Sequence, residues 1–151
     1  MNQINVMLVP TAQDYLILPA ELIAHVFPYA PPLLIDSGSE YIIGGLLIQN
    51  DKIPLVDYFS NKPLAERKDE DRSNYRVILV NAVNPQGRYR QYAILAHGEP
   101  LIMNAGEEDI PALGKGSHRY ITRYVNLAGH EDGKRIVLPN LMALEAELTM
   151  S

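Results

Sequence analysis

The 151-residue sequence contains no cysteine and no tryptophan. The absence of cysteine excludes disulfides and thiolate metal sites, and it makes a cytoplasmic location the simplest interpretation. No apolar run approaches the roughly 20 residues that a membrane-spanning helix needs. The first residues also lack the positive charge and the apolar core of a signal peptide. We therefore expect a cytoplasmic protein that does not insert into the membrane.

Positive charge is also scarce, with 13 Lys and Arg against 18 Asp and Glu and a formal net charge of −5. No basic groove is visible, so we do not expect nucleic acid or an anionic membrane as the main partner. Apolar residues make up 47% of the chain and charged residues 21%, which is ordinary for a globular protein. A chain of this length can bury roughly 70% of its unfolded surface. We expect residues 1–151 to form a single domain.

The sequence contains no recognisable motif for catalysis or metal binding. The four histidines are scattered, and no two of them have the i,i+4 spacing of a helical zinc site. His130-Glu131-Asp132 is expected in a solvated turn, and the acidic residues 107–109 in a solvated loop. No serine has the G-x-S-x-G surroundings of a hydrolase nucleophile. The sequence therefore predicts no catalysis, no metal and no cofactor.

Short β-strands dominate the expected secondary structure. We expect strands over residues 4–10, 15–18, 76–83, 88–97, 101–103, 120–127 and 134–138, and over 23–27 either a strand or a continuation of the helical turn before it. A helical turn is expected over 19–22, a loop over 28–40, a turn over 84–87 and irregular structure over 105–117. Past Pro139, leucines at helical spacing predict a helix of about ten residues with Asn140 as its cap. The mixed-charge segment 60–74 is expected to connect two strand-rich halves.

The stretch Ile43–Asp57 reads as two apolar runs joined by Gln49-Asn50-Asp51-Lys52. Asn and Asp tolerate positive φ, so this pattern predicts a tight hairpin over about 41–59. The pair Gly44-Gly45 suits a bulge or a close approach of two backbones. Pro54 cannot donate to a ladder, so the returning strand should be an edge strand or begin near that proline.

The same stretch resembles the signature of CheW-like chemotaxis coupling domains. That signature is a glycine, an apolar run, an Arg-Gly hairpin, and an apolar strand that contains Pro and ends in Asp. Gly44, Pro54 and Asp57 fall in register with it. Gln49 stands where the family usually has Arg, and Asn50 where it has Gly.

A weaker likeness covers most of the chain. Residues 15–19 and 23–26 resemble the family's early strand pair, with His25 in place of a usual Glu. Residues 77–80 and 92–96 resemble its central strands, although the usual Gly and Val-Asp pair are missing. Residues 109–111 resemble its acidic-Ile-Pro element, and the segment from 120 onward resembles its closing hairpin and terminal helix.

The resemblance implies a mainly β fold of two intertwined five-stranded β-barrels with a C-terminal helix. It also implies a non-catalytic adaptor that docks to the regulatory domain of a CheA-type histidine kinase and to the cytoplasmic tip of a chemoreceptor. The departures indicate a divergent relative, an accessory coupling protein of a type IV pilus chemosensory system for twitching motility. Two alternatives stay open: a small ligand-binding or hydrolytic β-barrel, and a structural scaffold without a kinase partner.

Two sets of residues follow from this interpretation. The residues expected to contact partners are His25, Val26, Ile48, Gln49 and Asn50. The residues expected to be largely buried where the two barrels meet are Leu46, Ile48, Val56, Ile78, Val80, Ile94 and Leu95.

Overall fold

The computed structural model describes residues 3–11, 14–33, 42–57, 71–106, 112–115, 121–125 and 136–148. Within them the chain forms strands, one 3-10 turn η1 (Ala20–Leu22) and one helix α1 (Leu141–Glu147). The strands are β1 (Gln3–Pro10), β2 (Tyr15–Pro19), β3 (Ile23–Pro28), β4 (Ile42–Ile48), β5 (Asp51–Val56), β6 (Arg76–Asn81), β7 (Gln91–Ala96), β8 (Leu101–Gly106), β9 (Ala112–Lys115), β10 (Ile121–Val125) and β11 (Ile136–Pro139).

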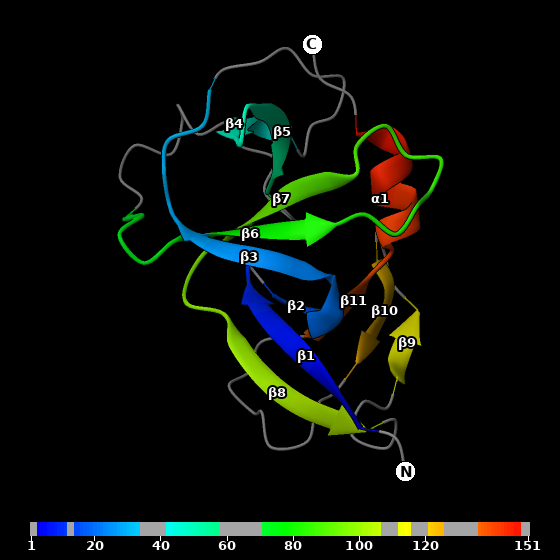
Figure 1. Ribbon diagram of the computed structural model, residues 1–151. Coiled ribbons are helices and arrows are strands. Elements are labelled where there is room, and N and C mark those ends of the chain that lie inside the picture. The colour runs from blue at the N-terminus through cyan, green and yellow to red at the C-terminus, as the bar shows by residue number, and fades with distance from the viewer. Residues whose placement is uncertain are drawn as a thin grey trace.

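The strands form two sheets, which Figure 1 shows one above the other with α1 beside them. The six-stranded sheet has the order β8-β1-β2-β11-β10-β9, and the five-stranded sheet the order β3-β6-β7-β5-β4. The chain starts in the first sheet, crosses after β2 to build the whole second sheet, and returns at β8. The expected mainly β fold with a C-terminal helix is confirmed. The expected five strands in each unit are wrong for the larger sheet, and no pairing among the described residues closes either sheet into a barrel.

The charged segment 60–74 does not lie between the two sheets along the chain. It follows β5 and precedes β6, and both strands belong to the five-stranded sheet. Residues 58–70 lie outside the described residues. The chain passes from one sheet to the other at the β2–β3 and β7–β8 connections instead.

The largest hydrophobic cluster lies between the two sheets and under α1. It takes Val9 and Leu16 from one sheet, Ile78 and Ile94 from the other, and Leu144 from the helix. β6 and β7 are buried on both faces, because their alternate side chains enter a second cluster on the far side of the five-stranded sheet. This double burial explains why residues 76–83 show no clean alternation of apolar and polar side chains.

Six of the seven predicted core residues are buried, but two of these six do not lie where the sheets meet. Ile48 is only half-buried. The residues confirmed as buried are Leu46, Val56, Ile78, Val80, Ile94 and Leu95. Leu46 and Leu95 belong to the cluster within the five-stranded sheet, whereas the other four lie between the sheets.

The β4–β5 hairpin has the expected tight turn. Gln49 and Asn50 are its two central residues, with φ of 52° and 70°, and Ile48 pairs with Asp51 directly beside them. Two consecutive positive φ values are typical of the type I′ turns that match the twist of a hairpin. The ladder is irregular between Ile42 and Gly44, as expected for a bulge.

The expectation of an edge strand at Pro54 is wrong, and β5 begins at Asp51, ahead of the proline. β5 lies between β4 and β7 in the sheet. The parallel pairing of β5 with β7 begins only at the next residue, with Leu55 opposite Ala93. The proline is tolerated because no N–H is needed from it in that ladder.

Helix α1 begins after its predicted cap. The Asn140 side chain accepts a hydrogen bond from the Ala143 N–H at 3.1 Å. Leu141, Leu144 and Leu148 are buried, as the leucine spacing predicted. The helix has seven residues, fewer than expected. Among the described residues, no helix is long and apolar enough to cross a bilayer.

Two expectations for the C-terminal part need correction. β8 extends beyond the short strand expected at 101–103, because it pairs with β1 along its whole length. Residues 112–115 form β9 on the edge of β10, where irregular structure was expected. The sequence Ala-Leu-Gly-Lys has little strand preference of its own, so pairing with a neighbour decides its conformation.

Candidate docking groove on the five-stranded sheet

An open apolar groove of about 790 Å³ lies between β3 and β4. These are the two edge strands of the five-stranded sheet, so the sheet curls until its edges face a common space. We call this space the β3–β4 groove. The residues that line it include Phe27, Tyr29, Leu33, Leu46, Leu47 and Val77.

The chain itself bridges one end of the groove. Leu33 N–H donates to the Gly45 carbonyl at 2.8 Å, and Gly45 N–H donates to the Leu33 carbonyl at 2.9 Å. This antiparallel bridge brings two backbones together at the double glycine, as the sequence predicted. A Cβ on Gly44 would lie 2.6 Å from Pro32 Cβ, so no side chain fits there.

Proline explains why the bridge does not continue along β4. Leu33 pairs with Gly45, so an antiparallel ladder would next place Pro31 opposite Leu47. Proline has no N–H to donate. The ladder therefore stops, the chain leaves β4, and both Pro31 and Leu47 line the groove. The edge of β4 at Leu47 is left accessible, and the Leu47 side chain is 65% exposed.

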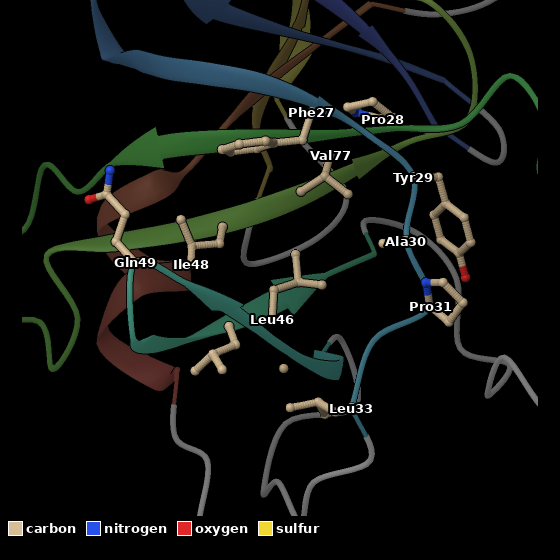
Figure 2. A pocket seen from close by; sticks show the side chains of 12 residues that line it. Phe27, Pro28, Tyr29, Ala30, Pro31, Leu33, Leu46, Ile48, Gln49 and Val77 are labelled. Atoms are coloured by element: carbon tan, nitrogen blue, oxygen red, sulfur yellow. The ribbon is translucent and has the colours of Figure 1, made fainter.

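Figure 2 shows how the side chains fill this space. Phe27, Val77, Leu46 and Ile48 point toward one another across the groove. Tyr29 and Pro31 stand at one end, and the Gln49 amide lies at the opposite end. The walls are thus apolar, with a polar amide at the hairpin end.

The structure brings together some of the residues predicted to contact partners. Ile48 and Gln49 line the β3–β4 groove, and Asn50 is exposed beside them in the hairpin turn. His25 is exposed on β3, and its ring packs on Phe27 with the centroids 4.4 Å apart. Whether these residues contact a partner stays a prediction.

Val26 points away from this face. Side chains alternate along a strand, and Val26 packs against the core between the sheets, while its neighbour Phe27 packs against the cluster on the groove side. The half-buried Val26 can therefore support the position of β3 but offers little surface to a partner. Leu47 and Tyr29 were not predicted from the sequence as groove residues. The signals that could have identified them are the double glycine near Leu47 and the prolines near Tyr29.

A buried aspartate–histidine pair lies at the end of β5 and β7. His97 Nε2 is 2.9 Å from Asp57 Oδ1, with the side chains 11% and 0% exposed. The His97 ring packs on Tyr75, and Tyr75 in turn meets the edge of Tyr29 at the end of the groove. His97 N–H also donates to the Pro10 carbonyl of β1 at 2.8 Å.

Asp57 and His97 have the residue types of an acid–base pair, but their position favours a structural role. Asp57 is the last residue of the signature stretch and lies after a strand of one sheet, while the backbone of His97 bonds to the other sheet. Both side chains are too buried for ready access by a substrate. We interpret the pair as a tie between the two sheets.

The described parts of the chain contain no group of three His, Asp or Glu side chains that could hold a metal ion. The acidic residues 107–109 and the segment 130–132, both expected to be solvated, lie outside the described residues.

Comparison with known proteins places the fold. No protein-family model matches the chain, and no curated protein matches it. The crystal structure of the scaffolding protein TtCheW from Thermoanaerobacter tengcongensis is similar, with a TM-score of 0.69 and 15% sequence identity. The likeness covers 99% of this chain and 96% of that chain. The protein therefore has a CheW-like fold, as the sequence resemblance implied.

Proposed function

We propose that the protein is a non-catalytic adaptor that couples chemoreceptors to a CheA-type histidine kinase in the cytoplasm. A scaffolding protein with the same fold along nearly the whole chain supports this proposal. The observation that carries it is the β3–β4 groove, an apolar surface at an accessible strand edge beside the hairpin turn. An adaptor acts through such surfaces and needs no reactive group.

The groove suits an extended segment of the kinase regulatory domain. An exposed strand edge can accept a further strand through main-chain hydrogen bonds, while pockets for alternate side chains give specificity. Leu47 lies two residues beyond Gly45, whose backbone already forms such a bridge with Leu33. A partner strand at Leu47 would continue the pairing that Pro31 interrupts. A contact of ordinary size would cover roughly 800 Å² on each partner.

The hairpin tip and the adjoining part of β3 are proposed to contact the receptor tip. Gln49 and Asn50 are exposed at the end of the groove, and His25 is exposed on β3. The family usually has Arg and Glu where Gln49 and His25 stand, so the matching partner should carry fewer complementary charges here. This favours a divergent system, and we propose a pilus-type chemosensory system.

Titration of the purified protein with the kinase regulatory domains and receptor tips of the same cell tests the proposal. We expect a kinase to bind with a dissociation constant of roughly tens of micromolar or tighter. Leu47→Asp places a charge in the groove and should weaken kinase binding at least tenfold. Leu101→Asp is the matched control, because Leu101 is a similarly exposed leucine on β8 of the other sheet. Equal binding by both variants would contradict docking in the groove.

A ligand-binding protein is the second candidate function. The groove volume of about 790 Å³ lies within the range of small-molecule sites. Such sites usually combine apolar walls with several polar groups that fix the ligand, and the Gln49 amide is the polar side chain that Figure 2 shows at the hairpin end. Binding of a small apolar ligand in the absence of any kinase or receptor binding would favour this candidate.

A further inference from the structure

A second hollow, of about 530 Å³, lies where the start of β5 meets the end of β6 and the loop before β7. Lys52 at the start of β5 lines it together with Arg88 and Arg90 from the loop before β7. We call it the arginine pocket. The sequence showed no basic groove, because these three cations come from segments about 40 residues apart that only the fold brings together.

The pocket carries an excess of positive charge on a chain whose net charge is −5. Asp51 also lines it, so three cationic side chains face one carboxylate. Both arginines are exposed. The guanidinium groups of Arg88 and Arg90 are therefore accessible to a partner.

Hydrogen bonds to the end of β6 hold the loop that carries the two arginines. Ala82 N–H donates to the Arg90 carbonyl at 2.8 Å, which fixes the loop at the end of β6. Gln91 Nε2 donates to Asn81 Oδ1 at 2.9 Å across the β6–β7 ladder. The two arginine side chains thus extend from an anchored loop, and less order has to be imposed when a partner binds.

We propose that the arginine pocket binds an acidic segment of a partner protein. The guanidinium group presents a planar fork of donors that matches a carboxylate. A nucleic acid would require a longer basic track, and small-molecule sites usually bury most of their ligand, which two exposed arginines do not favour. This charged contact goes beyond the apolar docking proposed above and does not depend on the identity of the kinase.

Fluorescein-labelled hexaglutamate is the probe, and its anisotropy reports binding at about 50 mM salt, where exposed charges are weakly screened. Because the protein as a whole repels an acidic peptide, binding identifies a local positive site. We expect binding to weaken about tenfold in Arg88→Ala/Arg90→Ala, since each exposed pair contributes modestly. Arg88→Lys/Arg90→Lys keeps the charge but lacks the planar guanidinium group. Its affinity should lie between those of the unmodified protein and of Arg88→Ala/Arg90→Ala.

Arg76→Gln is the matched control, since Arg76 lies at the opposite end of β6 from Asn81. It removes one positive charge outside the pocket and should change binding less than twofold. Far-UV circular dichroism confirms that each variant is folded. Equal binding of neutral hexaglutamine, or equal loss in Arg76→Gln, would overturn the proposal. Binding of inorganic phosphate without hexaglutamate binding would also overturn it, because the pocket would then be a small-anion site.

The experiment contains neither kinase nor receptor, so its failure is distinct from failure of the adaptor proposal. If hexaglutamate does not bind while a kinase does, the arginine pocket is not an acidic-segment site and the groove proposal stands.

Discussion

Replacing Glu145 by alanine should lower the free energy of unfolding by about 3 kcal/mol. Glu145 lies on α1 and is only 2% exposed. Its Oε1 accepts from the N–H groups of Val83 and Asn84, at 2.8 Å and 2.6 Å. Its Oε2 accepts from the Tyr92 hydroxyl at 2.8 Å. One carboxylate therefore ties the helix both to the loop after β6 and to the core strand β7.

The magnitude follows from the groups that lose their acceptor. A hydrogen bond to a charged group contributes about 1.5–3 kcal/mol, and an unpaired buried donor costs about 1–3 kcal/mol. Water can reach the partly buried N–H groups of Val83 and Asn84 and offset part of their loss. The Tyr92 side chain is fully buried, so water does not readily replace the acceptor that its hydroxyl loses. The expected 3 kcal/mol is a large part of the roughly 5–15 kcal/mol that stabilises a protein.

Urea denaturation measures the effect, provided that the m value stays the same. Glu99→Ala is the control, since it removes the same side chain from an exposed pair with Arg76 and should cost less than about 1 kcal/mol. Tyr92→Phe removes the hydroxyl that donates to Glu145, so the two variants share one hydrogen bond. The double variant should therefore cost at least about 1 kcal/mol less than the sum of the single variants. A loss below about 1 kcal/mol for Glu145→Ala, or strict additivity, would refute this reasoning.

Three further predictions concern local geometry. Gln49→Asn with Asn50→Gly should raise the unfolding free energy by about 1 kcal/mol, because both positions have positive φ. Gly44→Ala should lower it by about 2 kcal/mol or more through the clash with the chain beside it, whereas Gly98→Ala, whose Cβ would be 3.6 Å from its nearest neighbour, should cost less than about 1 kcal/mol. The Ser73 backbone N–H lowers the pKa of the exposed Asp71. NMR titration should find that pKa below its usual value, and the small stabilisation should be present at neutral pH and disappear as the pH falls through it.

Local chemistry made the hairpin predictable. Asn50 favours a tight turn, the double glycine suits a bulge, and all these features depend on neighbours in the sequence. The structure confirms the turn and the close approach at Gly44. The leucine spacing and Asn140 likewise predicted α1, because an amphipathic helix and its cap are local patterns.

The candidate site is formed by tertiary contacts, which short sequence patterns do not predict. The β3–β4 groove exists because two strands that are consecutive in the chain take opposite edges of one curled sheet, and because Pro31 ends a bridge begun at Leu33. The arginine pocket and the Asp57–His97 pair likewise join segments about 40 residues apart. β9 was missed because its strand conformation comes from pairing with β10.

The positions at which the chain passes from one sheet to the other were also not predicted. The mixed-charge segment 60–74 looked like a boundary, because a change in composition often separates units of a fold. The strands on either side of it pair within one sheet instead, and the chain changes sheets at short connections with no unusual composition.

The most direct test of the adaptor proposal is the autophosphorylation rate of the CheA-type kinase in the presence of receptor. Kinase and membrane-embedded receptor from the same cell are mixed with and without the protein. We predict that the rate responds to receptor stimulus only when the protein is present, and that Leu47→Asp abolishes this response while Leu101→Asp preserves it. A response that is the same with and without the protein, for every kinase and receptor of that cell, would contradict the proposed coupling function.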